Sequence, residues 1–159
     1  MAKIVQCRVD ERLMHGQASI WMQVNGSNSV IVANDEAAVS ETQQQLMKVT
    51  VPEGVRCSFY SVDKLIEIWP KAADWQLIYI VVKSIDDVYK LALGKLPIEE
   101  INIGNVHTRE DRVRITPSVN LSKDEKAKIK EMIDLGIKFN TASLPGVTKG
   151  LVDQNKLIS

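Results

Sequence analysis

The feature that most constrains the fold of this chain is its alternation of short, strongly apolar runs with longer amphipathic segments. Runs this apolar are typical of strands covered on both faces, as in a parallel sheet. The pattern therefore predicts a mostly parallel sheet, with strands at residues 4–9, 30–33, 55–60, 77–82, 98–103 and 136–141.

Helical periodicity fills the intervals between these runs, at residues 17–24, 36–49, 84–93, 122–135 and from Ser61 to about Pro70. Ser84 is a predicted N-cap with Gly94 as the stop, and Ser122 with Glu125 has the capping-box spacing. Strand and helix in alternation predict one α/β domain over residues 1–159: a three-layer open sheet with helices on both faces. Residues 113–116 predict a short antiparallel edge strand, and the tail after Leu144 is loosely specified.

Composition excludes several classes of protein. The chain is 45% apolar and 25% charged, and its 20 basic and 20 acidic side chains balance, so a nucleic-acid partner is not expected. No apolar run approaches the ~18–20 residues that span a bilayer, and the N-terminus lacks a signal-peptide core, which predicts a cytoplasmic protein. Cys7 and Cys57 lie in predicted strands and are expected to be free, buried thiols. No metal site, ATP-binding loop or cofactor is expected.

Unusual residues gather where the predicted strands end, which is where open α/β sheets bind ligands. The richest segment is residues 10–17, after the first strand. Its His15 stands just before a helix start, whose free amides favour anions. Arg12 could hold phosphate oxygens, and Gly16 permits close backbone approach and unusual φ. A neutral imidazole is a nucleophile near pH 7, so the segment suits phosphoryl transfer, although a loop histidine is more often a surface or hydrogen-bonded residue.

Residues 8–17, RVDERLMHGQ, followed by Trp21, closely resemble a signature of one family. It is the R-[IV]-D-[DE]-R-L-[ILMV]-H-G-Q signature of the IIB component of the mannose/fructose/sorbose class of the sugar phosphotransferase system. The resemblance continues at residues 32–38 and 101–107 and covers nearly the whole chain. The pair Gly104-Asn105 most resembles the N-acetylgalactosamine and related amino-sugar branch.

The resemblance implies a mechanism. His15 would be the phosphohistidine of a protein-N(pi)-phosphohistidine–sugar phosphotransferase, receiving the phosphoryl group from a IIA partner. It would pass the group to a sugar arriving through the membrane subunits IIC and IID, with which the cytoplasmic chain would associate peripherally. Arg12 would neutralise phosphate charge, Gly16 and Gln17 would offer amides, and Asp10 would orient His15 or Arg12. The implied protein needs no cofactor, and self-association as a homo-oligomer stays open.

Five further positions near strand ends are candidates for the same pocket, and some of them have a plainer alternative. Asn34 and Asp35 match the family segment, but Asp35 is more simply a cap of the helix that follows. Lys83 could meet phosphate or be solvated. Asn105 and His107 could line the pocket, and the nearby Arg109, Arg112 and Arg114 suggest an exposed basic stretch that helps IIA to dock. Trp21, at helical spacing, is more often a core residue than a ligand-stacking one.

Two other functions compete with phosphotransfer. One is a non-catalytic regulatory or sugar-binding module of the same fold. The other is a Rossmann-type nucleotide enzyme, which the first loop disfavours because it lacks G-x-G-x-x-G. The intact histidine motif favours the phosphotransferase.

Overall fold

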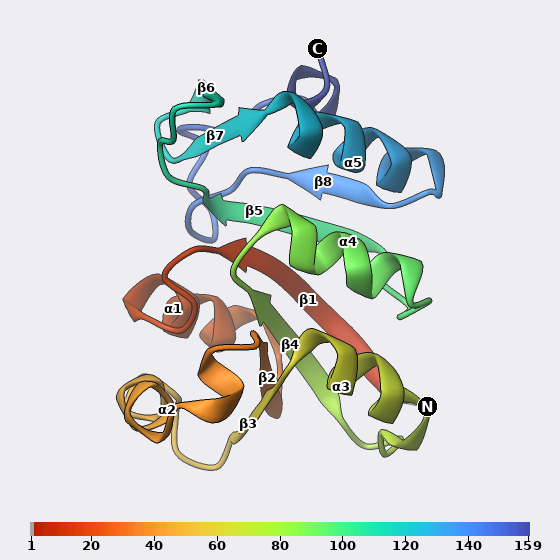
Figure 1. The fold of residues 1–159 in the computed structure, drawn as a ribbon. Coiled ribbons are helices and arrows are strands. Elements are labelled where there is room, and N and C mark those ends of the chain that lie inside the picture. The colour runs from red at the N-terminus through yellow and green to blue at the C-terminus, as the bar shows by residue number, and fades with distance from the viewer. Residues whose placement is uncertain (1) are drawn as a thin grey trace.

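The computed structural model describes residues 2–159, and its centre is a six-stranded, wholly parallel sheet (Figure 1). The order of the strands is β3-β2-β4-β1-β5-β8. Their bounds are β1 Lys3–Asp10, β2 Ser29–Ala33, β3 Arg56–Tyr60, β4 Leu77–Val82, β5 Glu100–Asn105 and β8 Lys138–Asn140. The predicted three-layer α/β architecture is confirmed.

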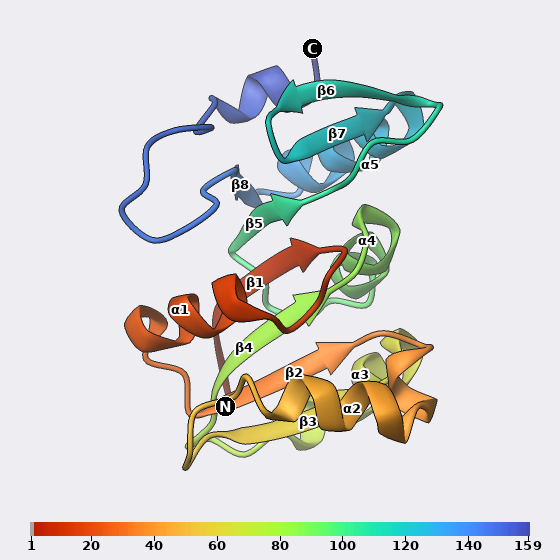
Figure 2. The ribbon, with the colours of Figure 1, turned by 90° about the vertical axis from the view of Figure 1, so that its left-hand side faces the viewer.

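Helices cover both faces of the sheet. Figure 2 shows α1 (Gly16–Asn25) and α2 (Glu41–Lys48) in front of the sheet. Behind it lie α3 (Val62–Ile68), α4 (Ile85–Leu93) and α5 (Lys123–Asp134). Three 3-10 turns complete the helical structure: η1 Ala37–Val39, η2 Trp69–Lys71 and η3 Gln154–Leu157.

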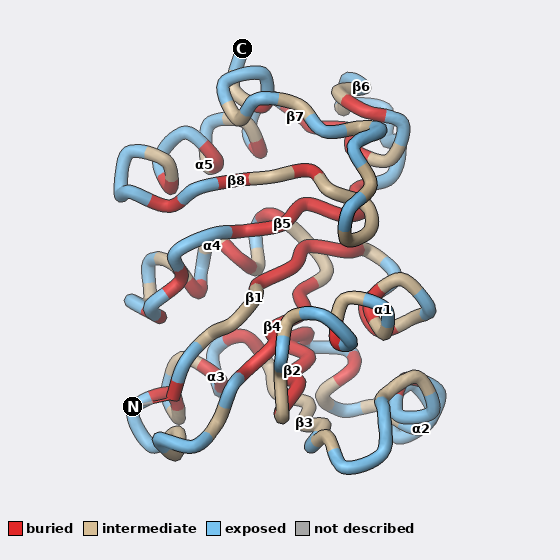
Figure 3. The backbone as a smooth tube through the Cα atoms, turned by 180° about the vertical axis from the view of Figure 1, so that it is seen from behind, coloured by how far each residue is buried: buried red, intermediate tan, exposed pale blue. Residues whose placement is uncertain are grey.

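Side-chain alternation along the central strands divides the core in two. In β4, Ile78 and Ile80 belong to the larger cluster beneath α3, α4 and α5, whereas Tyr79 and Val81 belong to the cluster beneath α1 and α2. All four are fully buried, and the central strands are the most deeply buried part of the tube in Figure 3. Burial on both faces explains why β4 is apolar without interruption.

The crossovers create a switch point between β1 and β5. The chain leaves β1 through α1 toward β2, whereas it leaves β5 toward β8 on the opposite side (Figure 1). In such sheets the carboxyl ends of the two strands bound a crevice that is suited to a ligand. Asp10 and Asn105 end these strands and are register partners. The switch point therefore places the start of residues 10–17 beside the loop after β5.

The antiparallel strand predicted at residues 113–116 is present as β6 (Arg112–Thr116), but it does not extend the main sheet. It pairs with β7 (Val119–Ser122) in a separate two-stranded sheet. The position beside β5 is already taken by β8, so β6 cannot pair there. A single bridge between Val106 and Val119 joins this small sheet to the end of β5.

Helix caps account for several boundaries. Ser122 and Glu125 form the predicted capping box at the start of α5, and Ser84 caps α4 as predicted. The single helix predicted over residues 36–49 is wrong. Ser40 is extended there and accepts a hydrogen bond from the Gln43 amide, which ends η1 and starts α2.

The two cysteines are free, as expected. Cys7 is fully buried and burial raises its pKa to about 12, whereas Cys57 is half-buried with a pKa raised to about 11 for the same reason. The tail beyond Leu144 is more specific than expected, because Leu157 is fully buried in the larger core cluster. Across residues 2–159, no helix combines the length and apolar character that crossing a membrane requires.

Candidate functional site

The loop between β1 and α1 has an unusual backbone. Leu13 has a φ of 56°, in the left-handed region that disfavours a branched side chain. Its side chain is buried in the core cluster beneath α1 and α2, and its amide donates to the Asp10 carbonyl, so packing holds the strained conformation. The unusual φ expected at Gly16 is not there, because Gly16 is the first residue of α1.

His15 is the N-cap of α1, and both of its ring nitrogens have partners. The Gln17 amide donates to Nδ1 at 3.3 Å, and Nε2 lies 2.5 Å from Asp10 Oδ2. The side chain is 19% exposed, so the ring is held from within the protein yet is open to solvent on one side. The structure thus places the predicted histidine at the helix terminus with its orientation fixed.

Asp10 is the fully buried centre of the site. Burial by itself raises the pKa of this carboxyl group, but its polar neighbours outweigh burial and hold the pKa below the usual value. Those neighbours are His15, the Arg12 amide, Arg8 and Asn105. Asp10 is therefore an ionised acceptor toward the histidine at neutral pH.

Gln17 gathers three donors on its side-chain oxygen. Arg12 Nη2 donates to Gln17 Oε1 at 2.8 Å, Asn105 Nδ2 at 3.1 Å and Arg8 Nη2 at 3.3 Å. Arg12 itself is 45% exposed, and its Nε lies 3.8 Å from Asp10 Oδ1. Asn105 also donates to Asp10 Oδ2 at 2.9 Å. The structure thus brings Asp10, Arg12 and Gln17 together around His15, and with them Asn105 of β5, which was a candidate for the same pocket.

Arg8 was not among the predicted site residues, although the motif contains it. Its guanidinium is fully buried, lies 3.3 Å from Asp10 Oδ2 and donates to Asn102 Oδ1 at 2.5 Å. An arginine inside an otherwise apolar strand is a signal for such a buried network, since buried charges need partners. Trp21 is part of the same arrangement, with its ring centroid 5.9 Å from the guanidinium carbon.

His107 belongs to a neighbouring cluster built around Glu11. Its Nδ1 lies 2.9 Å from Glu11 Oε2, and Arg112 Nη1 donates to Glu11 Oε1 at 2.7 Å. Arg112 also forms a bidentate pair with Glu125, and its side chain is only 5% exposed. The expectation of an exposed basic stretch is therefore wrong for Arg112, because its guanidinium is buried in ion pairs with Glu11 and Glu125. The structure links His107 to Glu11 and not to Asp10.

The remaining candidates stand apart from the His15 network. Asn34 Oδ1 accepts from the Ala37 amide, which stabilises the turn after β2. Asp35 does not cap its own helix, because its Oδ1 accepts from the Val62 amide at the start of α3. Lys83 directly follows β4 and is half-buried, and its side chain forms no hydrogen bond or ion pair with any of residues 2–159.

The switch point of this parallel sheet thus holds a histidine that caps a helix N-terminus beside a buried carboxylate, which is the kind of site that suits an anionic ligand. Residues 4–158 match the sorbose subfamily of IIB components of the phosphotransferase system, and the chain belongs to this family.

Relatives of this family include an N-acetylgalactosamine-specific phosphotransferase enzyme IIB component 2 of Escherichia coli K12. It is 35% identical over 99% of this chain and 100% of its own length. A probable phosphotransferase enzyme IIB component of Streptococcus pyogenes serotype M6 is 36% identical over 83% of this chain and 85% of its own. The crystal structure of an N-acetylgalactosamine IIB component from Streptococcus pyogenes superposes with a TM-score of 0.92 at 41% identity, covering 96% of each chain.

Proposed function

We propose that the chain accepts a phosphoryl group on His15 from the phosphohistidine of a IIA protein and transfers it to a sugar during uptake. The observation that carries this proposal is the geometry of His15, which caps α1 while Nε2 faces the Asp10 carboxylate. Family membership supports the reaction class, because IIB components belong to the phosphotransferase system.

Nδ1 is the nitrogen that receives the phosphoryl group. An ionised Asp10 can only accept a hydrogen bond, so the proton of the neutral imidazole resides on Nε2. The lone pair is then on Nδ1, where the Gln17 amide points. Nδ1 also lies at the N-terminus of α1, so its lone pair faces the end of the helix that favours an anion.

The surroundings of Nδ1 suit a phosphoryl dianion. The amides of Gly16 and Gln17 belong to the first turn of α1, where backbone N–H groups are free of intrahelical partners. A Cβ at Gly16 would meet no atom within 4 Å, so the space beside this amide is open to a ligand. Arg12 is near enough to Gln17 and exposed enough to turn its guanidinium toward phosphate oxygens.

The transfer proceeds in two displacements. The Gln17 amide gives up its hydrogen bond to Nδ1, which frees the amide for a phosphate oxygen. The Nδ1 lone pair then forms a bond to phosphorus while the bond from phosphorus to the donor histidine breaks, and the electron pair of that bond returns to the donor nitrogen. His15 then carries a phosphoryl group on Nδ1 and a proton on Nε2, and the Asp10 carboxylate balances the cationic ring. A sugar hydroxyl oxygen next attacks phosphorus, the hydroxyl proton passes to a base, and His15 leaves as a neutral imidazole because Nε2 kept its proton.

An amino sugar of the N-acetylgalactosamine type is the proposed acceptor. Both Escherichia coli component 2 and the superposed Streptococcus pyogenes structure carry that specificity in their names. We assign the chain to the cytoplasmic side of a membrane transporter, with IIA as donor and with IIC and IID as the subunits that present the sugar.

The test is phosphorylation of the purified chain with radiolabelled phosphoenolpyruvate, the general carrier proteins and a cognate IIA. We expect an acid-labile, base-stable label that His15→Ala abolishes. His107→Ala is the matched control and should be labelled normally, because His107 lies against Glu11. Label that survives His15→Ala but disappears in His107→Ala would overturn the assignment. Nitrogen-15 spectra of the labelled histidine distinguish Nδ1 from Nε2.

A further inference from the structure

The buried Arg8 ties the phosphorylation site to three other parts of the molecule. Its Nη1 donates to Asn102 Oδ1 on β5, and Nη1 and Nη2 each lie 3.4 Å from a carbonyl of the C-terminal segment, those of Ala142 and Ser143. Its Nη2 also reaches Gln17 on α1. All of these groups converge on one guanidinium that has no exposure to solvent.

Gly104 gives the guanidinium its space. A Cβ at position 104 would overlap the guanidinium carbon and both terminal nitrogens of Arg8. The backbone of β5 thus lies directly against the plane of the side chain, and only glycine allows this approach without displacing Arg8. Asn102, two residues before Gly104 on β5, holds the same guanidinium in place. Its Nδ2 donates to Asn140 Oδ1 and to the Ala142 carbonyl, and these bonds fix the orientation of the Oδ1 that accepts from Arg8.

Stability alone does not explain a buried arginine of this kind. Replacing a buried ion pair by well-packed apolar side chains is often neutral or stabilising, so such a pair is weak evidence for a stabilising role. The direction of the contacts is more informative. Arg8 Nε donates to Asp10 Oδ2 at 3.3 Å, and the same oxygen lies 2.5 Å from His15 Nε2. The arginine therefore contacts the same carboxylate oxygen of Asp10 that faces the histidine.

We propose that Arg8, seated against Gly104, is a positioning residue for phosphoryl transfer that fixes the Asp10 carboxylate against His15 Nε2 and so presents Nδ1 to the incoming phosphorus. The proposal rests on the proposed function of His15. Arg8 does not touch the phosphoryl group, since its side chain has no exposure to solvent. Outer partners that orient a reacting side chain typically contribute about 10–100-fold to activity.

The proposal also predicts the pH dependence of transfer. The charged or titratable groups facing Asp10 are Arg8 on β1, Arg12 and His15 on the loop, and Tyr79 on β4; the neutral Asn105 faces it from β5. Removing the Arg8 charge takes away a cation that lowers the pKa of Asp10. Asp10 would then accept a proton at higher pH, and the acid limb of the transfer rate should move to higher pH.

The experiment measures the initial rate of His15 phosphorylation against pH for three variants of the full chain. Arg8→Gln removes the charge and should slow transfer by about 10–100-fold and move the acid limb upward. Arg8→Lys keeps the charge, but its single ammonium group cannot bind all of the partners of Arg8. Its acid limb should therefore lie near that of the unmodified chain, and its rate should lie between those of Arg8→Gln and the unmodified chain. Gly104→Ala leaves Arg8 present but displaced and should slow transfer without any change of charge.

Gly94→Ala is the matched control. A Cβ there would crowd Ile66 in the core at 2.8 Å, so this variant tests the cost of overpacking at a glycine that contacts no site residue. Rates are expressed per folded molecule, measured by circular dichroism, and Gly94→Ala should match the unmodified chain.

Two results would overturn the role of Arg8: a folded Gly104→Ala that transfers at the normal rate, or folded Arg8 variants with the normal rate and pH profile. Gly104→Ala decides the matter if the Arg8 variants do not fold. A label that persists in His15→Ala would instead overturn the proposed function.

Discussion

The two faces of β1 and β5 are buried equally but built differently. Toward α3, α4 and α5 these strands present apolar side chains, namely Cys7, Val9, Ile101 and Ile103, all without exposure. Toward α1 they present Arg8, Asp10 and Asn102, which are 2% exposed or less. The apolar face is stabilised by close packing of side chains, whereas the polar face needs a hydrogen-bond partner for every buried polar atom. Within the same two strands, one face thus serves the packing of the core and the other holds the side chains around Asp10.

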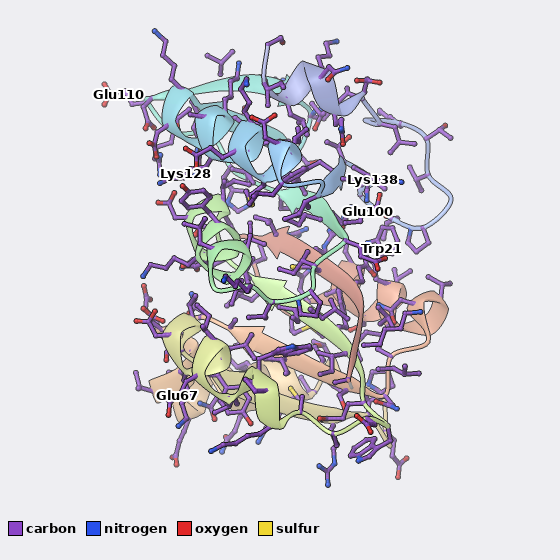
Figure 4. The ribbon with its side chains drawn as sticks, turned by 90° about the vertical axis from the view of Figure 1, so that its right-hand side faces the viewer. Trp21, Glu67, Glu100, Glu110, Lys128 and Lys138 are labelled. Atoms are coloured by element: carbon purple, nitrogen blue, oxygen red, sulfur yellow. The ribbon has the colours of Figure 1, made fainter. Side chains whose placement is uncertain are left out.

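Figure 4 locates the solvent side of the polar face. Trp21 on α1 and Glu100 at the start of β5 are labelled close together, and both line a surface cavity of about 480 Å³. Asn102 and Asn140 also line it, and Asn140 Nδ2 donates to Glu100 Oε2. The hydrogen-bond network of the site thus continues from His15 through Asp10 and Arg8 to the surface on the far side of β5.

The polar face can be broken most severely at Asp10. Asp10→Asn keeps the shape, but its amide group donates to His15 Nε2, which moves the imidazole proton to Nδ1 and removes the lone pair. We expect phosphorylation of His15 to slow by about 10²–10⁴-fold, by analogy with the loss of an orienting aspartate elsewhere. The initial rate of labelling checks this. A rate within about threefold of the unmodified chain would show that Asp10 does not set the tautomer.

The same variant has a pH signature in stability. The pKa of Asp10 is lowered by folding, so the carboxylate stabilises the native state above the unfolded pKa of about 3.9, and this contribution is lost as pH falls through the lower folded value. Asp10→Asn should therefore be less stable than the unmodified chain at pH 7, and the gap should narrow below about pH 4. Denaturant titrations across this range provide the measurement.

A substitution on the apolar face should lower stability without changing the rate of phosphorylation. Ile101→Ala removes a fully buried side chain from the larger core cluster and should lower the free energy of unfolding by about 2–5 kcal/mol. Its labelling rate per folded molecule should stay within about twofold, because the side chain points away from Arg8 and Asn102. Urea unfolding and the labelling assay give the two numbers. A large loss of rate with little loss of stability would contradict the separation of the faces.

The smallest expected effect comes from Tyr79, which faces α1 but sits outside the polar network. Its buried hydroxyl has no hydrogen-bond partner among residues 2–159, and burial raises its pKa. Tyr79→Phe removes the unsatisfied group and should leave stability unchanged or raise it by about 1 kcal/mol. Thermal unfolding measures the change. A loss greater than about 1 kcal/mol would mean that the hydroxyl is solvated or bonded in the folded protein.

Local signals in the sequence were enough to locate the six strands of the main sheet, but not the break between η1 and α2. The capping box at Ser122 and the apolar run of β4 depend on neighbours in the chain, and both are confirmed. The motif around His15 also lies within one loop and helix start, so its members could be gathered from the sequence.

The errors arise where distant segments meet. Arg112 was expected to be exposed because nothing near it in sequence shows that Glu11 and Glu125 both reach it. Asp35 was assigned to its own helix, whereas the fold presents the Val62 amide to it. Arg8 was overlooked because its partners Asn102 and Ala142 lie far along the chain. These contacts depend on the order of the strands in the sheet, and hydrophobic periodicity does not predict that order.

The contacts of Arg8 with the Ala142 and Ser143 carbonyls have a consequence for the order of folding. Asn102 on β5 and the segment after β8 lie far along the chain from Arg8. Arg8 therefore gains all of its partners only after β5 and this segment have packed against β1. The surroundings of Asp10 and His15 are thus a product of the assembled sheet and not of the loop between β1 and α1 alone.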